Sequence, residues 1–306
     1  MDKAEYIAIE KIKSMTQEQM IKYLLDCVKR SCDCFFHLLY KWREKYTSSI
    51  SEKEAVAQCL LQMMLCNTKS IISLFDGINL IPENNHSIID PVSMVAILRS
   101  VYERTYIFHN VFVEPESDSE KTIMFNLWKI RGLNNRQKID NIPEIYTHKR
   151  DREKQEIEFI KQETESLLIN LKLTEQARIK IKKEIKSESS SIKGYRFVKS
   201  QDGSIIDFET ISLTNSPLGL FNDKDFTSLY KLLSWNAHPS FLGVLQFGQM
   251  FDEGADKSLE ITILESLLFF HNKFITDFIS VVSGAKEVFD NLSEQDKIII
   301  MALNKH

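Results

Sequence analysis

Apolar residues recur every three or four positions along most of the chain, and this period is typical of amphipathic helices. In the N-terminal half this period predicts three helices. The first covers 16 to about 46, the second runs from a capping box at 51 to 77, and the third covers roughly 120–135. A loop is expected over 78–89. With only 9 glycines and 6 prolines in 306 residues, we expect long helices joined by few tight turns.

The stretch Asp90–Val113 is apolar on nearly every side, so it predicts a buried helix of about six turns that begins at Asp90. A polar stripe nevertheless runs along one side of this helix: Arg99, Glu103, Tyr106 and Asn110. Buried charges persist when they are paired and hydrogen-bonded. The stripe is therefore either a functional site or a structural ion pair.

The composition changes after about residue 143. Residues 149–187 are heavily charged, contain no glycine or proline, and carry a thin apolar stripe. We expect two helices there, the second capped at Thr174, that form an arm projecting from the body. Five lysines gather near the end of this arm: Lys180, Lys182, Lys183, Lys186 and Lys193. They could contact nucleic-acid phosphates, or they could form a solvated helix end favoured by the helix dipole.

An Asp-Gly pair at 202 and 203 separates two alternating apolar runs within Gly194–Thr210, which predicts a β-hairpin. Helical period resumes at Asp225. That helix should end at His238, because the residue before Pro239 disfavours the α region. Further helices are expected near 241–250 and 259–283, with a short one after 293.

These elements predict an all-α fold: a multi-helix bundle with a protruding charged helical pair and one small β-hairpin. We expect an N-terminal helical part of the bundle over 1–142, the charged arm over 143–193, and the hairpin with the C-terminal helical part over 194–306. No apolar run approaches the roughly 18 residues of a membrane span, and the first residues lack the order of a signal peptide. We therefore expect a cytoplasmic protein with no membrane partner. A net charge of −4 requires any nucleic-acid binding to be local.

Most motifs of cofactor or metal chemistry are absent. The sequence has no glycine-rich phosphate loop, no G-x-S-x-G, no H-E-x-x-H and no dinucleotide fingerprint. Five cysteines lack the spacing of a zinc site: Cys27, Cys32, Cys34, Cys59 and Cys66. We expect reduced core thiols, no metal and no cofactor.

The central helix carries the first candidate site. Arg99 and Glu103 can pair along one face, and Arg104 and His109 flank that face. Arginine is a fixed cation suited to a phosphate, and histidine can move a proton near neutral pH. Arg104 and His109 lie about 140° apart around an ideal helix, so they meet only through distortion or a dimer partner.

The second candidate site is the helix end that contains Ser234, Asn236 and His238. Ser234 and His238 share one face, and Pro239 holds the histidine at the helix terminus. That histidine is placed either for proton transfer or for capping the last carbonyls. A serine and a histidine without an orienting acid do not define a hydrolase triad. His37 and His271 lie within predicted helices and are interpreted as packing residues.

The two elements together, R-S-x-x-E-R-x-x-x-x-H and a later helix ending S-x-x-x-H-P-S, resemble a bacterial family of unknown function. Its members look distantly like HEPN proteins, helical bundles that often act as metal-independent RNases in toxin–antitoxin and phage-defence systems. The resemblance covers roughly 53–250 without the charged arm. Arg104 to His109 fits the loose HEPN pattern, with Thr105 in place of the usual asparagine. The ending at 236–238 has the polar-then-histidine order, but no arginine stands at the required distance before it.

This resemblance implies the first functional hypothesis, a HEPN-like RNase that acts in defence or as a toxin. The base would be His238 or His109, the cation Arg99 or Arg104, and the nucleophile the 2′-hydroxyl of RNA. HEPN sites usually form between protomers, so a homodimer is implied, and a toxin implies an antitoxin partner. The second hypothesis is a non-catalytic helical module whose arm binds a partner protein or nucleic acid.

Overall fold

A computed structural model of the chain describes residues 14–46, 50–81, 86–189, 193–211, 223–237, 241–253 and 255–301. Contacts divide the chain into two compact units, Met1–Thr105 with Gly219–His306, and Tyr106–Leu218. These bounds differ from the three-part division expected from the sequence. The all-α prediction is confirmed, since helices dominate and the described strands form only two-stranded antiparallel sheets.

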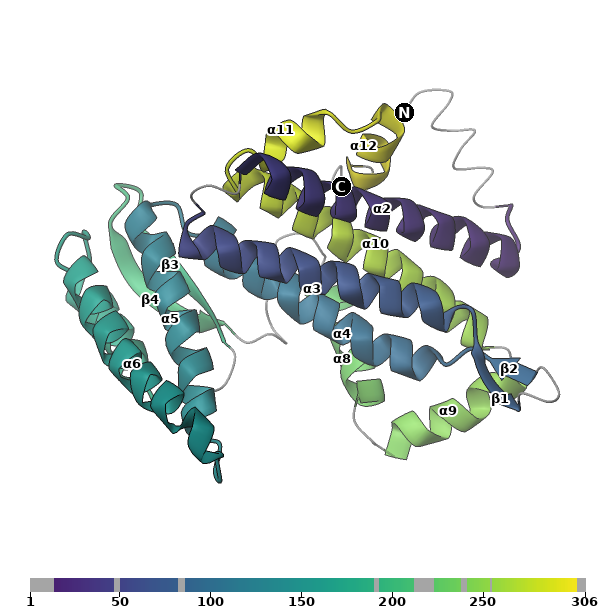
Figure 1. Ribbon diagram of the computed structural model, residues 1–306, viewed down its shortest axis with the longest axis horizontal. Helices are drawn as coiled ribbons and strands as arrows, with labels where there is room; N and C mark the ends of the chain where they lie inside the picture. Colours follow the sequence, from purple (N-terminus) through teal and green to yellow (C-terminus); the bar gives the residue numbers. More distant parts are fainter. Residues whose placement is uncertain are drawn as a thin grey trace. The chain divides into compact units, whose positions relative to one another are not determined.

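The first unit is a bundle of long helices, with α2, α3 and α10 running lengthwise (Figure 1). Its elements are α2 (Gln17–Tyr46), α3 (Glu52–Leu74), β1 (Ile78–Ile81), β2 (His86–Ile88), most of α4 (Pro91–Phe108), α8 (Asp223–Ala237), α9 (Phe241–Glu253), α10 (Ala255–Val281), α11 (Ala285–Asp290) and α12 (Glu294–Met301). The expected loop at 78–89 is wrong in part, because Ile78 pairs with Ile88 in a short antiparallel ladder between β1 and β2.

The core of the first unit forms where α2 packs against α3 and α10. Phe35 and Phe274 stack with ring centroids 6.1 Å apart, and Trp42 donates from Nε1 to the Ser283 carbonyl at 2.7 Å. The predicted capping box starts α3, since the Glu54 amide donates to Ser51 Oγ at 3.3 Å. The aromatic contacts hold α2 against α10, and the capping box fixes the start of α3.

The buried histidine of this unit is His271 on α10. Its Nδ1 lies 3.1 Å from the Ser31 hydroxyl of α2, and its Nε2 lies 2.6 Å from the Thr68 hydroxyl of α3. His271 is therefore a packing residue, as interpreted from the sequence. His37 is exposed on α2, so the same interpretation is wrong for that residue.

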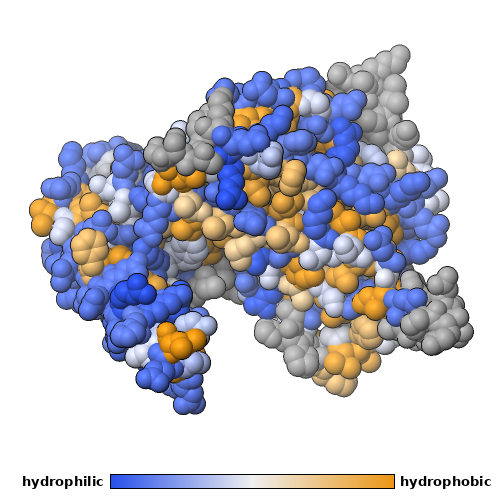
Figure 2. Space-filling view, in the orientation of Figure 1, coloured by the Kyte–Doolittle hydropathy of each residue, from blue (hydrophilic) through white to orange (hydrophobic). Residues whose placement is uncertain are grey.

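The second unit packs helices on a β-hairpin. Its elements are the π-helical turn η2 (His109–Val113), α5 (Asp118–Gln137), the short 3-10 turn η3 (Glu144–Tyr146), α6 (Thr147–Leu167), α7 (Glu175–Lys186), β3 (Gly194–Lys199) and β4 (Ile205–Ile211). The β3–β4 hairpin is confirmed, and Gly203 in its turn has φ 79°, which favours glycine. Figure 2 shows that the visible face of α6 is mostly hydrophilic.

The charged segment forms the two expected helices, but their apolar stripe is buried within this unit. Ile157 and Ile160 of α6 pack with Ile130 and Leu133 of α5. A second cluster joins α5, α7 and the hairpin: Ile123, Met124, Leu127, Leu168, Ile181, Ile185, Tyr195 and Phe208. The thin stripe is enough because each helix needs to cover only one face.

All five cysteines are free thiols. Cys32 and Cys34 are buried as expected, whereas Cys59 and Cys66 are exposed, so the expectation of core thiols is wrong for these two. Among the residues that the structure describes, none of the helices combines the length and the hydrophobicity that a membrane crossing requires.

Candidate functional site

The helix α4 begins as the sequence predicts and carries the first candidate site. Asp90 Oδ1 accepts hydrogen bonds from the amides of Val92 and Ser93 at 3.1 and 3.2 Å. Arg99 and Glu103 then form an ion pair one turn apart, with 3.0 Å between Nε and Oε1. Their side chains are 22% and 28% exposed, so the pair is accessible to a ligand rather than enclosed.

Tyr230 of α8 completes this site and is not among the residues predicted from the sequence. Arg99 donates from Nη2 to the Tyr230 hydroxyl at 3.4 Å, and the guanidinium carbon lies 5.5 Å from the ring centroid. Tyr102 packs against the same ring, with centroids 5.3 Å apart. The available signal was periodicity, because Tyr230 shares a helix face with Ser234 one turn later.

The second candidate site lies on the same helix α8. The Ser234 hydroxyl is buried and has no hydrogen-bond partner among the described residues. Asn236 donates from Nδ2 to the Leu232 carbonyl at 3.0 Å, so its amide is engaged within its own helix. The described part of α8 ends at Ala237, and the predicted helix end at His238 falls beyond it. His238 lies outside the described residues.

Arg104 and His109 are the remaining catalytic candidates. Arg104 Nη1 is buried without a hydrogen-bond partner among the described residues, and burial lowers the pKa of this guanidinium. Glu103 and the Cys66 thiol act in the opposite direction. His109 is half-buried and is the first residue of the π-helical turn η2, where the predicted single helix changes period.

The polar stripe of the predicted helix does not continue past this change of period. Asn110 lies in η2 and binds both backbone groups of Tyr195 on β3: Nδ2 donates to the carbonyl at 2.7 Å, and Oδ1 accepts from the amide at 3.0 Å. Asn110 therefore caps the outer edge of the hairpin. Its role is structural rather than part of the Arg99–Glu103 site.

The basic cluster lies on α7. Lys180 pairs with Asp207 of β4 at 2.6 Å. Lys182, Lys183 and Lys186 are exposed, and the described residues provide no ion-pair partner for them. Lys193 is half-buried just before β3.

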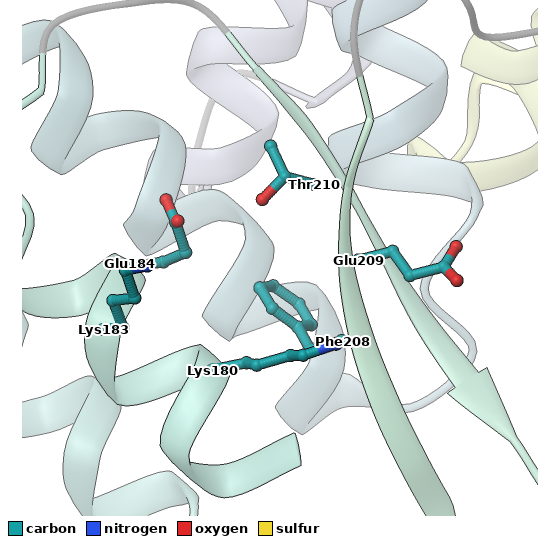
Figure 3. A pocket seen from close by; sticks show the side chains of 6 residues that line it. All are labelled: Lys180, Lys183, Glu184, Phe208, Glu209 and Thr210. Carbon is teal, nitrogen blue, oxygen red and sulfur yellow. The ribbon is translucent and has the colours of Figure 1, made fainter. Parts of the chain in front are cut away.

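A pocket of about 390 Å³ lies beside this cluster, lined by Lys180, Lys183 and Glu184 of α7 and by 208–210 of β4. Figure 3 shows Phe208 and Thr210 extending from β4 toward α7, while Glu209 points the other way. Two lysines thus stand beside an open pocket. Lys183 is exposed and suited to contact a phosphate there, whereas Lys180 is already paired with Asp207.

A buried polar network in the second unit was also missed. Arg131 is 3% exposed, donates from Nε to the Tyr195 hydroxyl at 3.1 Å, and pairs with the Glu184 carboxylate. The Tyr195 hydroxyl donates to Glu184 Oε2 at 3.0 Å, and burial raises the pKa of Tyr195 to about 12. Since each of these groups is satisfied by protein, we interpret the network as structural.

The fold and site define an all-α protein with a partly exposed Arg–Glu–Tyr cluster on two helices. The chain belongs to the family described as "Family of unknown function (DUF5677)", whose family model matches residues 62–256. That range contains α4, η2 and α8, and all the catalytic candidates fall within it. No curated protein and no solved structure matches the chain.

Proposed function

We propose that this protein is a HEPN-like, metal-independent endoribonuclease that acts as a toxin or phage-defence effector. The observation that carries the proposal is the contact of Arg99 with Tyr230. It brings a partly exposed guanidinium to α8, one turn before Ser234 and two turns before the position of His238 in the sequence. Glu103 lies one turn further along the same helix and holds the Arg99 guanidinium in place through their ion pair.

The chemistry needs a base, a cation and the RNA itself. The base, His238, takes the proton of a 2′-hydroxyl, and the resulting oxygen attacks the adjacent phosphorus. The bond from phosphorus to the 5′-oxygen breaks, that oxygen takes a proton from water, and the imidazolium of the base returns its proton to the solvent. Products are a 2′,3′-cyclic phosphate and a 5′-hydroxyl end. Arg99 stabilises the charge that develops on the phosphate oxygens, while Arg104 and His109 form the alternative cation and base.

RNA cleavage by the full chain in EDTA tests the proposal. We expect Arg99→Ala to lower the rate by roughly 100-fold or more, and His238→Ala to lower it by a similar or larger factor. His109→Ala and Arg104→Ala decide between the two base and cation assignments. His37→Ala and Arg43→Ala are matched controls, because both residues are exposed on α2 and should leave cleavage unchanged.

Stability measurements accompany the assay. The Arg99–Glu103 pair is partly exposed, so Arg99→Ala should lower the free energy of unfolding by only about 1 kcal/mol. Folded protein that cuts no RNA, or cutting that survives replacement of both His109 and His238, contradicts the nuclease proposal.

The homodimer that the resemblance implies belongs to this proposal. It is supported by α9, which exposes five apolar side chains: Phe241, Leu242, Val244, Leu245 and Phe247. Figure 2 shows apolar residues at the surface along this helix. Exposed apolar patches mark association surfaces. Sedimentation should give a dimer that Val244→Asp converts to a monomer, whereas a monomeric wild type contradicts the dimer.

The alternative function is a non-catalytic helical module that binds nucleic acid or a partner protein. Three exposed lysines of α7, which have no ion-pair partner among the described residues, favour it: Lys182, Lys183 and Lys186. Their joint replacement by glutamine should weaken RNA binding and make it less dependent on salt, because fewer phosphates are then neutralised by the protein. RNA binding without cleavage would favour this module over the nuclease. An antitoxin or another protein partner stays a proposal, to be sought by co-purification.

A further inference from the structure

A pocket of about 560 Å³ opens in the first unit, on residues that the proposed nuclease does not use. Its apolar wall comes from three segments: Ile21 and Leu25 of α2, Phe75 after α3, and Ile88 and Ile89 at the end of β2. All of these side chains are partly buried. The volume and apolar wall are typical of pockets for small organic molecules.

Glu260 of α10 lines the same pocket and is only 4% exposed. It forms no hydrogen bond or ion pair within the described part of the chain. Buried carboxylates are normally paired, because desolvation of a lone charge is costly. Burial accordingly raises the pKa of Glu260 to about 7, and the nearby Asp256 adds to this effect.

Among the described charges around the pocket, Lys257 opposes the rise in the pKa of Glu260 but forms no ion pair with it. Lys257, one turn before it, is engaged with Glu18 of α2 at 2.6 Å. Asp256 adds a second negative charge on the same helix, and Lys22 of α2 is exposed at the rim. The segments at Phe75 and Ile88–Ile89 contribute apolar side chains. Within the described part of the chain, Glu260 thus lies beside the apolar wall of the pocket without a hydrogen-bonded or ion-paired partner.

We propose that this pocket binds a small organic cation, a primary ammonium on an apolar chain, with the ammonium on Glu260 and the chain against Ile21, Leu25 and Phe75. The ammonium supplies the ion-pair partner that none of the described residues gives Glu260. Transfer of the chain from water to the apolar wall supplies further binding free energy. An anion would meet Glu260 and Asp256, which excludes carboxylates of the same shape.

The test uses the full chain and three probes of one length: n-hexylammonium, 1-hexanol and hexanoate. Calorimetry at pH 8 should show binding of the ammonium, weaker binding of the alcohol and none of the carboxylate. Glu260→Gln should weaken ammonium binding by about ten-fold or more and leave the alcohol unaffected. The matched control is Glu265→Gln, an exposed glutamate on the same helix, which should bind as the wild type does.

The pH dependence gives a second readout. Protonation of Glu260 removes the negative charge, so ammonium affinity should fall as the pH decreases through about 7, and Glu260→Gln should show no such fall. Glutamine has the size of glutamate without the buried charge, so this variant is expected to fold. No millimolar binding of hexylammonium, or equal binding by wild type and Glu260→Gln, overturns the proposal. Neither result bears on RNA cleavage.

Discussion

The tautomer of His271 follows from its two hydroxyl neighbours. Thr68 Oγ1 donates to the Met64 carbonyl at 2.9 Å, so it accepts from Nε2 of the imidazole. Nδ1 is then the acceptor for the Ser31 hydroxyl. Full burial lowers the pKa of His271 to about 3. The native imidazole is therefore neutral over the physiological range.

This neutral histidine makes the fold sensitive to acid. In the unfolded chain His271 binds a proton below about pH 6.5, whereas in the native state it does so only near pH 3. The free energy of unfolding should therefore fall as the pH decreases below 6.5. We expect His271→Gln to be less stable by roughly 1–3 kcal/mol at pH 7.5, with the difference shrinking by pH 4.5. Urea unfolding at both pH values measures it, and a constant difference contradicts the assignment.

Glu260 should act in the opposite direction. Its native pKa of about 7 lies above its unfolded value, so the native state binds more protons between pH 4.5 and 7 and loses stability as the pH rises. We expect Glu260→Gln to be more stable than the wild type by on the order of 2 kcal/mol at pH 8. The two chains should be similar at pH 4.5. If Glu260→Gln is more stable than the wild type by the same amount at both pH values, ionisation of the Glu260 carboxyl group is not the cause of the difference.

At the residue scale the sequence predicts contacts that one helix determines. Helical geometry alone brings Arg99 and Glu103 together, and the structure has that pair. The contact of Tyr230 with Arg99 could not be predicted, because 131 positions separate the two residues and the contact depends on how two helices pack. The same holds for Glu260, whose pocket combines residues from α2, β2 and α10 with Phe75 after α3.

At the element scale, Asn110 binds the backbone of β3 at the edge where a further β-strand could pair, and so anchors the hairpin. Asn110→Leu leaves the Tyr195 amide and carbonyl without their partner, so we expect the free energy of unfolding to fall by about 2–4 kcal/mol. Hydrogen exchange at the Tyr195 amide should accelerate more than exchange in α5. Asn135→Leu, at an exposed position of α5, is the matched control. Unchanged exchange at Tyr195 would contradict this role.

Most helices could be predicted because their period and caps are local properties. The π-helical turn at His109–Val113 could not, since every residue in it also fits an α-helix. The β1–β2 ladder was missed because its strands are short and irregular, with a shift in register between Asn79 and Ile81. The packing of the charged helices on α5 and the hairpin could not be predicted, because this partner surface comes from both sides of them in the sequence.

At the scale of the whole molecule, damage to one compact unit should be confined to it. Arg131→Met leaves Glu184 and the Tyr195 hydroxyl without their cation, and such a loss typically costs about 3–5 kcal/mol. We expect hydrogen exchange to increase across 106–218 and to stay nearly unchanged in α10. Arg152→Met, at an exposed position of α6, is the control. Equal acceleration in both units would show that they unfold as one.

The fold class could be predicted from composition and period, but the division into units could not. A boundary after Thr105 falls inside α4, where the sequence shows no linker, no proline and no change of composition. The first unit also joins residues from both ends of the chain. Such a division depends on long-range packing, which a single sequence does not display.

The π-helical turn makes the number of residues at 109–113 more important than their identity. Removal of one residue would let the turn close with the usual α-helical period, and everything after it would rotate by about 100° about the helix axis. Asn110 would then no longer meet the edge of β3. Substitutions at exposed atoms of this turn should be tolerated, whereas a one-residue deletion should separate the hairpin from its anchor. Along this short stretch, the number of residues determines how the following elements are oriented.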